Sequence, residues 1–460
     1  MSLKNKIQFR SLIKHSAKEI FDWHLRCRKL ERCIPPFEKT EVISSEGSPD
    51  KIGSEFSVRS KVFGFFSLKQ VLQYHEFTQN ESYALHLKKR ALGFYNYSTQ
   101  ITRQEPHASE IIDQFEFFLN CPQFFSPFLT KYLKKRMGRA LAYKHELIDY
   151  DIGMLQKYPF EKPLRILMSG SHGLIGKNVG YFLEFAGHDV WHLSRRKENK
   201  TKTVFWNSET GECNPENFEA FDVVIHLAGE NIGKGWWTKK KKDKILKSRY
   251  EGTKNLVGIL KTLKTPPKTF ICASAIGYYG NRGNDILSET SAPGKGLFIS
   301  EVCEKWEKAS ADLQSIGIRV VHTRFGMVLS AAGGALKKLI FPFKLGLGGK
   351  IGSGRQYISW VAIDDVVGAI YHVMMTPSIE GAVNVVSPNP ITNKKFTKKL
   401  AKRFHRWVGP PIPEFIIRLI MGQKGKELLL SSTRVEPRRL FETGYNFRYS
   451  KLSQVLEHVV

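Results

Sequence analysis

The fold of this chain is decided by residues 165–176, which read Arg-Ile-Leu-Met-Ser-Gly-Ser-His-Gly-Leu-Ile-Gly. Residues 165–168 form an apolar run that predicts a buried strand, and a helical pattern follows in residues 177–186. Between strand and helix stand Gly170, Gly173 and Gly176. Glycine lets the backbone turn tightly and approach a pyrophosphate, and a helix N-terminus offers unpaired N–H groups. This order predicts a loop that binds the diphosphate of a dinucleotide.

The residues around this loop alternate between strand and helix. Helical patterns separate several short apolar segments, which is typical of an α/β domain with helices on both faces of a parallel sheet. We therefore predict a Rossmann doubly wound parallel sheet, of the α/β class, for residues 164–390. The segments that predict its strands are residues 165–168, 190–193, 223–227, 269–273 and 320–324.

The segments on either side of this domain have other patterns. Residues 1–155 contain no glycine-rich phosphate loop and favour an α+β domain in which a curved antiparallel sheet wraps a helix. Residues 391–460 are helical and basic, and predict a small C-terminal domain. The elements expected in the first segment are strands at 7–12, 55–59 and 111–117 and helices at 17–28 and 127–150.

Composition limits the compartment and the cofactors. The chain has 460 residues, so two or three domains are expected. It has no apolar run long enough for a membrane span, and its first residues lack the apolar region of a secretory signal. Its six cysteines have no CxxC or paired spacing. We therefore expect a cytoplasmic protein with reduced thiols, without a disulfide framework or a metal site.

The formal net charge of the chain is +28. Such an excess is compatible with nucleic acid or anionic lipid as a partner. The basic residues are spread along the chain, however, and residues 239–242 form the only tight run. Because no aromatic and basic recognition motif accompanies them, we expect no specific nucleic acid partner. We interpret the charge as solvated surface and as attraction for phosphorylated ligands.

The N-terminal segment resembles a known ligand-binding fold. Trp23-His24 and Pro35-Pro36-Phe37 resemble the start of the polyketide-cyclase and START-like helix-grip family. The resemblance implies an apolar ligand between sheet and helix, with His24 as a candidate base. Plain core packing and a structural histidine are the alternatives. The aromatic residues that could line such a cavity are Phe115, Phe117, Phe118, Phe124, Phe125 and Phe128.

The GxxGxxG spacing of residues 170–176 resembles the extended short-chain dehydrogenase/reductase (SDR) family. Residues 226–229, 248–256 and 273–280 resemble later segments of this family in the same order. Arg195 follows the second strand, where an NAD-specific protein would carry an acid. An arginine there suits the 2′-phosphate of NADP(H), with NAD and a plain surface charge as the alternatives. The cofactor-binding residues that the resemblance implies are Gly170, Ser171, Gly173, Leu174, Ile175, Gly176, Arg195, Leu227, Ala228, Gly229 and Ser274.

Further motifs narrow the resemblance to one atypical branch of the extended SDR family. Its members are labelled NAD(P)-dependent nucleoside-diphosphate-sugar epimerases or cell-division-inhibitor-like proteins. Some members carry a helix-grip domain N-terminal to the SDR domain. The residues of this chain from Pro410 onward resemble the C-terminal domain of unknown function in this branch. The motifs are Gly229-Glu230-Asn231-Ile232, Cys303-Glu304-Lys305-Trp306-Glu307, Gly346-Leu347-Gly348-Gly349, Gly352-Ser353-Gly354-Arg355-Gln356 and Ser359-Trp360-Val361.

The catalytic pair of the SDR family is missing. The resemblance calls for a tyrosine and a lysine one helical turn later, which lowers the tyrosine pKa so that it can transfer a proton while the nicotinamide takes hydride. With Glu307 as the anchor, these positions fall on Ile299 and Cys303. Catalysis is therefore unusual, slow or absent. Ser274 and Tyr278 are the candidate catalytic residues, with backbone hydrogen bonding and aromatic packing as the alternatives.

A small-molecule substrate is expected beside the cofactor, and the resemblance implies a nucleotide sugar. The glycine-rich loop 346–355 can expose N–H groups to an anion and ends in a cation. Three functions stay open: an NADP-dependent epimerase or oxidoreductase, a non-catalytic NADP(H) sensor or scaffold, and a carrier of an apolar ligand. The candidate substrate-binding residues are Glu230, Asn231, Tyr279, Arg355 and Trp360.

Overall fold

The structure is a computed structural model that describes residues 5–47, 50–62, 66–88, 93–119, 126–197 and 201–460. The chain divides into two compact units, Met1–Pro159 with Phe185–Gly187 and Phe160–Glu184 with His188–Val460. Residues 391–460 thus belong to the second unit. The domain boundaries expected at residues 155, 164 and 390 stay predictions.

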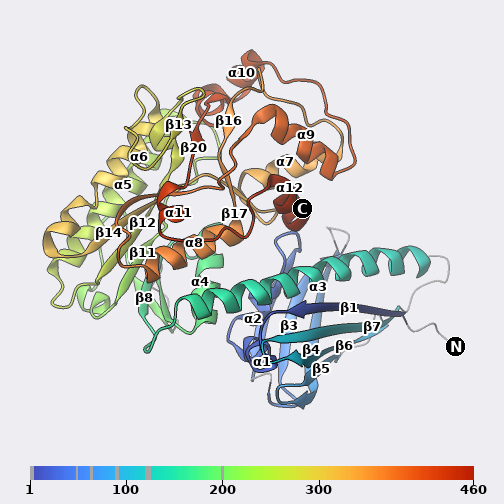
Figure 1. Ribbon diagram of the computed structural model, residues 1–460. Coiled ribbons are helices and arrows are strands. Elements are labelled where there is room, and N and C mark those ends of the chain that lie inside the picture. Colours follow the sequence, from blue (N-terminus) through green and yellow to red (C-terminus); the bar gives the residue numbers. More distant parts are fainter. Residues whose placement is uncertain (1–4, 48–49, 63–65, 89–92, 120–125, 198–200) are drawn as a thin grey trace. The chain divides into compact units, whose positions relative to one another are not determined.

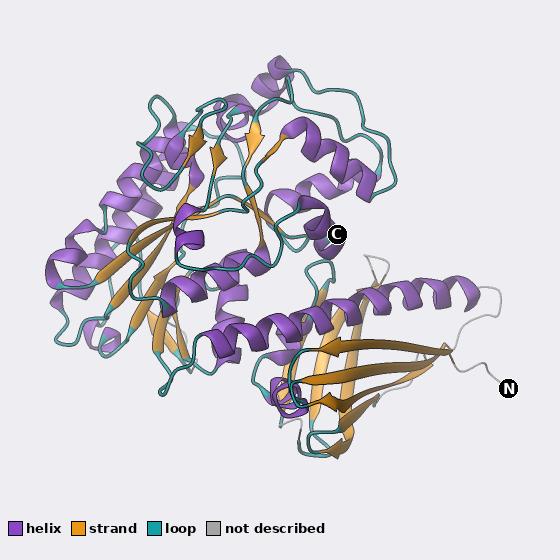
Figure 2. Ribbon diagram, in the orientation of Figure 1, coloured by secondary structure: helices purple, strands orange, loops and turns teal. Residues whose placement is uncertain are grey.

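The first unit is a seven-stranded antiparallel sheet with one long helix (Figures 1 and 2). The strand order is β1-β7-β6-β5-β4-β3-β2, so consecutive strands pair and β1 lies beside β7. Antiparallel neighbours need only short connections, which suits this arrangement. The predicted α+β class is confirmed, whereas the likeness to START-like domains stays a prediction. The elements are β1 (Asn5–Ile13), α1 (Ala17–Leu25), α2 (Lys29–Cys33), β2 (Thr40–Glu46), β3 (Glu55–Val62), β4 (Phe66–Thr78), β5 (Ser82–Leu87), β6 (Gly93–Glu105), β7 (Ala108–Leu119) and α3 (Ser126–Lys157).

The helix predicted at residues 17–28 ends three residues earlier, at Leu25, and a second short helix follows at Lys29–Cys33. α1 begins after Ser16, which forms a capping box with Glu19. It ends at Leu25, and Arg28 then adopts a left-handed φ of 59°. A residue in that region cannot continue a right-handed helix, so α2 begins afresh at Lys29. As a consequence of this local break, Lys29 lies buried in the first unit.

The predicted aromatic cavity of the first unit is only partly described. Phe115 and Phe117 on β7 are buried, whereas the Phe128 side chain on α3 is 65% exposed. Phe124 and Phe125 lie outside the described residues. The two buried rings pack against each other with centroids 5.5 Å apart, as core residues do. An apolar ligand in this unit stays a prediction.

The second unit is built on a seven-stranded parallel sheet of order β10-β9-β8-β11-β12-β14-β18. Counted from β8, this order is 3-2-1-4-5-6-7, which contains the 3-2-1-4-5-6 order of dinucleotide-binding folds. The predicted Rossmann sheet is therefore confirmed, and β10 and β18 are strands that the sequence pattern did not predict. The strands are β8 (Arg165–Ser169), β9 (Asp189–Ser194), β10 (Thr203–Phe205), β11 (Val223–His226), β12 (Thr269–Ala275), β14 (Arg319–Phe325) and β18 (Gly381–Val385).

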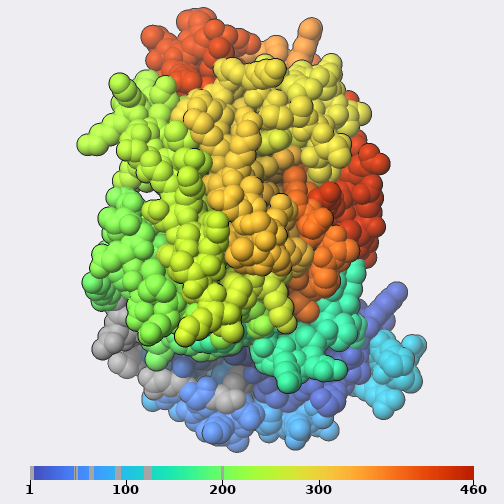
Figure 3. All heavy atoms as spheres, turned by 90° about the vertical axis from the view of Figure 1, so that its left-hand side faces the viewer, coloured from blue at the N-terminus to red at the C-terminus, as the bar shows by residue number. Residues whose placement is uncertain are grey.

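Helices cover both faces of this sheet. Figure 1 shows α5 (Lys239–Thr262) and α6 (Phe298–Lys308) on one side and α4 (Leu174–Ala186) and α8 (Ile363–Met375) on the other. Figure 3 looks onto the side that carries α5, in yellow-green. The basic run at residues 239–242 forms the first turn of α5, and Thr238 caps it by accepting a hydrogen bond from the Lys241 N–H. The strands are consequently buried on both faces, which explains their continuous apolar runs.

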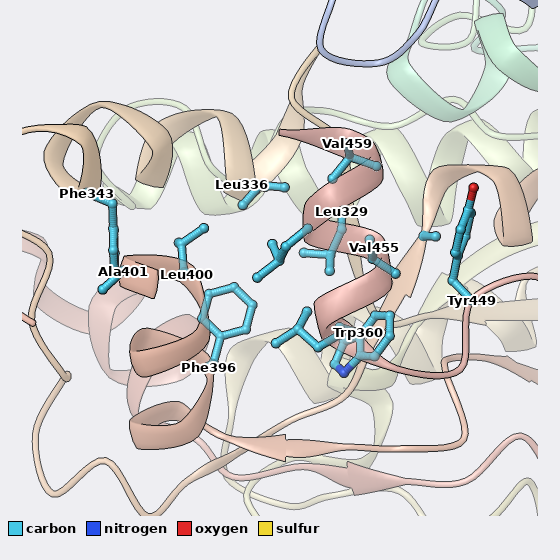
Figure 4. Packing of buried hydrophobic residues seen from close by; sticks show 13 residues of the cluster. Leu329, Leu336, Phe343, Trp360, Phe396, Leu400, Ala401, Tyr449, Val455 and Val459 are labelled. Atoms are coloured by element: carbon cyan, nitrogen blue, oxygen red, sulfur yellow. The ribbon is translucent and has the colours of Figure 1, made fainter. Parts of the chain in front are cut away.

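The C-terminal residues pack onto the second unit through one apolar cluster (Figure 4). Phe396 and Leu400 come from α9, Val455 and Val459 come from α12, and Trp360 belongs to the same cluster. The segment contributes α9 (Asn393–Arg403), α10 (Glu414–Gly425), β20 (Arg434–Val435), α11 (Arg438–Glu442) and α12 (Leu452–Val459), and the shorter elements before it are β13 (Ile286–Leu287), β15 (Met327–Leu329), α7 (Gly334–Lys344), β16 (Tyr357–Ile358), β17 (Trp360–Ala362) and β19 (Ile391–Thr392).

Among the residues that the structure describes, no helix is long and apolar enough to cross a membrane.

The Arg32–Asp151 ion pair should contribute strongly to the stability of the first unit. The Arg32 Nη2 and Asp151 Oδ1 atoms are 2.7 Å apart, and both side chains are almost fully buried. Because Arg32→Leu leaves a buried carboxylate without its cation, it should lower the free energy of unfolding by about 3–5 kcal/mol. The matched control Arg59→Leu breaks an exposed pair with Glu41 and should cost less than about 1 kcal/mol. Native-state hydrogen exchange of the β1–β7 amides measures both, and equal effects would contradict the prediction.

Candidate functional site

The glycine loop lies where the strand order reverses. β8 has β9 on one side and β11 on the other, and in such folds ligands bind outside the carboxyl ends of the strands at this point. Gly170 has a φ of 71°, and a Cβ on it would lie 2.6 Å from the carbonyl carbon of Leu227. A Cβ on Gly176 would overlap the carbonyl oxygen of Gly170. The loop thus forms a backbone cradle with no room for a side chain at Gly170 or Gly176, which is the geometry that a diphosphate-binding loop requires.

Ser169 and His226 connect this loop to the end of β11. The Leu227 and Ala228 N–H groups donate to Ser169 Oγ at 3.1 and 3.2 Å, and His226 Nδ1 lies 2.7 Å from the same oxygen. Burial lowers the pKa of His226 to about 4, so its ring is neutral at physiological pH. Sequence reasoning missed both residues, although a hydroxyl directly before the first glycine was a visible signal.

The other predicted cofactor residues belong to the same edge of the sheet. The Gly173 N–H donates to the Gly170 carbonyl at 2.9 Å, which closes the turn before α4. Ser171, Leu174 and Ile175 are half-buried at the start of α4. Arg195 directly follows β9 and is exposed, as is its neighbour Arg196. Their roles in cofactor binding stay predictions.

Glu230 lies in a basic environment just beyond β11. Its carboxylate pairs with Lys241 and lies 3.9 Å from Lys244. The hydrogen bond from Lys241 lowers the pKa of Glu230, so the side chain is ionised at neutral pH. Arg249 donates to the Glu230 carbonyl at 3.1 Å. Asn231 accepts from the Gly233 N–H at 2.9 Å, which is turn chemistry, and its contact with substrate stays a prediction.

Ser274 belongs to a buried network around Arg324. Its hydroxyl donates to Glu307 Oε1 at 2.6 Å. Arg324 binds the same carboxylate through two hydrogen bonds of 2.8 and 2.7 Å. Burial opposes the charge of Arg324, but the Glu307 carboxylate raises its pKa overall. The Ser274 proton is therefore already committed to Glu307. Sequence reasoning missed Arg324, although an arginine at the end of an apolar strand was a signal.

Tyr278 and Tyr279 contact opposite parts of the Arg324 guanidinium. Its Cζ atom lies 3.6 Å from the centroid of the Tyr278 ring, and Nη1 donates to the Tyr279 hydroxyl at 2.8 Å. Tyr279 in turn donates to Asn384 Oδ1 at 2.6 Å, and burial raises its pKa to about 12. Since the Tyr279 side chain has no exposed surface, its predicted contact with substrate is corrected to a supporting role. Tyr278 is half-buried and keeps an exposed part.

Ile299 and Cys303, where the tyrosine and lysine of the family were expected, lie in an apolar cluster with Trp237, Ile245 and Val302. Both side chains are buried on α6. A Cβ on Gly277 would lie 2.9 Å from Ile299 and 3.7 Å from the Cys303 sulfur, so α6 packs closely against the residues after β12. Burial raises the pKa of the Cys303 thiol to about 12, which makes it a poor nucleophile.

Trp360 and Arg355 differ in accessibility. Trp360 is fully buried in the apolar cluster of Figure 4, and its Nε1 donates to the Asn389 carbonyl at 3.0 Å. Its predicted substrate contact is therefore corrected to packing behind the site. Arg355 is exposed at the end of a loop in which Gly352 and Gly354 have positive φ. Its binding of a substrate anion stays a prediction.

The sheet order and the backbone cradle at its switch point define a dinucleotide-binding protein of the Rossmann class. The family described as the NAD dependent epimerase/dehydratase family matches residues 166–386, and a domain of unknown function, DUF1731, matches residues 412–459. The epimerase family protein YfhF of Bacillus subtilis is 36% identical over 301 residues, which are 65% of this chain and 98% of that protein. The chain therefore belongs to this NAD-dependent epimerase family.

Solved structures give the same assignment. A crystal structure of the nucleoside-diphosphate sugar epimerase from Corynebacterium glutamicum matches with a TM-score of 0.80 and 28% identity, covering 98% of this chain and 90% of that one. The human epimerase family protein SDR39U1, solved with NADPH, matches with a TM-score of 0.59 and 30% identity, covering 64% of this chain and 99% of that one.

The burial of Cys303 predicts a slow reaction with alkylating reagents. In the native chain iodoacetamide should modify the exposed Cys27 while Cys303 stays unmodified, because the latter is buried and its pKa is raised to about 12. Peptide mapping by mass spectrometry measures both sites, with denatured protein as the control in which Cys303 becomes reactive. Equal modification of Cys27 and Cys303 in the native chain would make Cys303 a catalytic candidate again.

Proposed function

We propose that this chain binds NADP(H) at the glycine cradle and uses it in a slow epimerase-type or oxidoreductase reaction on a small molecule. The observation that carries the proposal is the close backbone packing of the glycine loop. A side chain on Gly170 would overlap the Leu227 backbone, and one on Gly176 would overlap the Gly170 backbone. The loop lies at the switch point of a sheet of order 3-2-1-4-5-6-7. Gly170, Gly173 and Gly176 would hold the diphosphate together with the N-terminus of α4. The NADPH in the related human protein supports the phosphorylated form of the cofactor.

Arg195 is our candidate for recognition of the 2′-phosphate. It is exposed directly after β9, the second strand of the cofactor half, where the ribose of the adenosine binds in this class of fold. A guanidinium there forms charge-assisted hydrogen bonds with a phosphate. An acidic side chain directly after β9 would favour NAD by accepting hydrogen bonds from its ribose hydroxyls, and none stands there in this sequence.

The bound cofactor would supply or accept hydride, and a side chain of this chain has to move the accompanying proton. Tyr278 is the candidate because it keeps exposed surface beside the Ser274–Glu307–Arg324 network. Burial raises the pKa of Tyr278 despite the Arg324 guanidinium beside it. Near neutral pH the Tyr278 hydroxyl is therefore protonated and can donate its proton. The phenolate form that could accept a proton is scarce, and this is the physical reason to expect slow turnover.

A substrate with a diphosphate and a sugar agrees with the related Corynebacterium glutamicum epimerase. Glu230, Asn231 and Arg355 are our candidates for contacts with it, because each keeps exposed surface beyond the strand ends or in the glycine-rich loop. A non-catalytic NADP(H) sensor is the second candidate function. The apolar cluster of Ile299 and Cys303, which replaces a proton-transfer pair, favours it.

The preference for NADPH should depend on Arg195. Arg195→Ala removes the charge-assisted hydrogen bonds to the 2′-phosphate, so NADPH affinity should fall about 10- to 100-fold while NADH affinity stays unchanged. The matched control Arg196→Ala removes an adjacent exposed arginine and should have a smaller effect. Fluorescence titration of both nucleotides measures the dissociation constants. A selective loss of NADPH affinity in Arg196→Ala instead would assign the role to Arg196.

Hydride transfer distinguishes the two candidate functions. Deuterated NADPH should transfer its label slowly to a carbonyl compound of a test panel, and NADP⁺ should take up label slowly from deuterated alcohols or nucleoside-diphosphate sugars, as followed by mass spectrometry. Transfer should be lost in Tyr278→Phe and in Gly176→Ala, where the added Cβ overlaps the Gly170 backbone. Gly180→Ala on the same helix is the control, since its Cβ would meet only ordinary contacts of 3.7 and 3.9 Å. Bound NADPH without any transfer would favour the sensor function.

A further inference from the structure

The interior of the first unit contains charges that the proposed function does not use. Its described buried residues include three cations, Lys29, Arg32 and Lys144, and two carboxylates, Asp113 and Asp151. Arg32 pairs with Asp151 at 2.7 Å, and Lys144 pairs with Asp113 at 3.0 Å. Lys29 is therefore the cation that remains without a carboxylate among these residues.

Lys29 has aromatic neighbours but no hydrogen-bond acceptor. Its Nζ atom is buried and has no hydrogen-bond partner among the residues that the structure describes. It lies 5.2 Å from the ring centroid of Tyr74 and 5.0 Å from that of Tyr83. Aromatic faces attract an ammonium group, but they leave its N–H donors unsatisfied. A buried ammonium of this kind is costly for the fold, so it points to a partner that is not part of the chain.

A second buried nitrogen lies close to the same tyrosine. The ring of His24 is 5.2 Å from that of Tyr83, and its Nε2 atom also has no hydrogen-bond partner. Burial lowers the pKa of His24 well below its usual value, with the Lys144 and Lys29 charges adding to the effect. His24 is therefore neutral and cannot compensate the charge of Lys29. It offers a further polar contact next to the ammonium.

A cavity of about 330 Å³ adjoins Lys29, which is within the size range of small-molecule sites. Lys29 and Tyr74 form part of its wall, and Leu25, Leu30 and Phe56 add apolar surface. The wall also contains Arg26, which donates to the carbonyls of Phe185 and Ala186, and Arg28, which pairs with Glu31. Cations beside apolar side chains suit an amphipathic anion.

The acidic residues in the wall of this cavity have partners of their own. Glu31 pairs with Arg28 at 2.7 Å, and Glu55 pairs with Lys88. Neither carboxylate forms a hydrogen bond with Lys29, whose Nζ has no such partner. Lys29 is thus a residue of the cavity wall whose buried ammonium has no carboxylate partner among the described residues, even though acids occur in the same wall.

We propose that this cavity binds a small organic carboxylate, whose head group pairs with the Lys29 ammonium and whose apolar part contacts Leu25, Leu30 and Phe56. The site lies within the first unit and is independent of the cofactor cradle. It also differs from the purely apolar ligand expected from the sequence, because its anchor is a charge.

Binding of such an anion should be coupled to protonation of Lys29. Burial is the main cause that lowers the pKa of Lys29, to a net value of about 7. The charge of Lys144 also lowers this pKa, whereas Cys33 and Asp50 raise it. Above that pH the empty site loses its proton, so an anion binds there only with uptake of a proton. Affinity should therefore be highest below about pH 7 and fall up to tenfold per pH unit above it.

The groups around Lys29 do not titrate in this range. Burial raises the pKa of Cys33 to about 11 and that of Tyr83 above its usual value, so both stay neutral. The pKa of Tyr74 is also raised by burial. Burial alone would lower the pKa of Lys144, but the Asp113 carboxylate raises it, so Lys144 stays charged. The pH dependence of binding thus reports on Lys29.

Octanoate and octan-1-ol are a matched pair of probes, since they share an apolar chain and differ in charge. Isothermal titration of the full chain should show octanoate binding with one site and tighter affinity than octan-1-ol. Lys29→Met, which removes the ammonium but keeps an unbranched apolar side chain, should weaken octanoate about tenfold or more and leave octan-1-ol unchanged. The control Lys18→Met removes an exposed lysine of α1 and should leave octanoate affinity unchanged.

Three results would overturn the proposal: no octanoate binding at about millimolar concentration, equal affinity for octanoate and octan-1-ol, or unchanged octanoate affinity in folded Lys29→Met. If Lys29→Met does not fold, the wild-type chain still decides the question. Titrations in buffers of different ionisation enthalpy should show proton uptake on octanoate binding above the Lys29 pKa. Binding without proton uptake would place the anion away from Lys29.

Discussion

The second unit depends on the close approach of the Gly170–Gly176 backbone to the end of β11. A Cβ on Gly170 would lie 2.6 Å from the Leu227 carbonyl carbon. The Ser169 hydroxyl accepts hydrogen bonds from the N–H groups of Leu227 and Ala228, which follow β11. These contacts hold the loop where the strand order reverses and leave the N-terminus of α4 exposed to a ligand. The cradle is therefore a property of the backbone, and it constrains residue size more than residue chemistry.

Near the carboxyl ends of β12 and β14, a buried network is centred on Arg324. Glu307 accepts from Ser274 and from Arg324, and Arg324 also holds Tyr278 and Tyr279. Because the side chains of Ser274, Glu307, Arg324 and Tyr279 are joined by hydrogen bonds, the network is well suited to rigid positioning. On α6, Ile299 and Cys303 form apolar packing. Under our proposal, binding of the cofactor and movement of a proton are served by separate parts of the unit, and only the first has kept the usual residues.

The first unit has the opposite character, since its interior contains charges that its sheet does not require. Arg32–Asp151 and Lys144–Asp113 are balanced pairs, whereas Lys29 contacts only aromatic faces. Lys29 is the first residue of α2, which the left-handed Arg28 separates from α1. A local backbone feature therefore places an unpaired cation beside a cavity, and this makes the first unit a binding domain in its own right under our proposal.

The sequence by itself determined the class of the second unit, the glycine loop and the absence of the tyrosine–lysine pair, because these depend on local order and spacing: apolar strand, glycines and helix stand within residues 165–186. It also indicated Arg195 and the α+β class of the first unit. The tertiary structure decided which side chains meet. Ser274 and Arg324 are 50 residues apart in sequence but face each other across paired strands β12 and β14. Tyr279 and Trp360 are buried by packing that no local pattern reveals. Contacts between distant segments also determine the short strands β10 and β18 and the charge balance around Lys29. The periodicity of a sequence indicates which face of an element is buried, but it does not indicate which distant residue packs against that face.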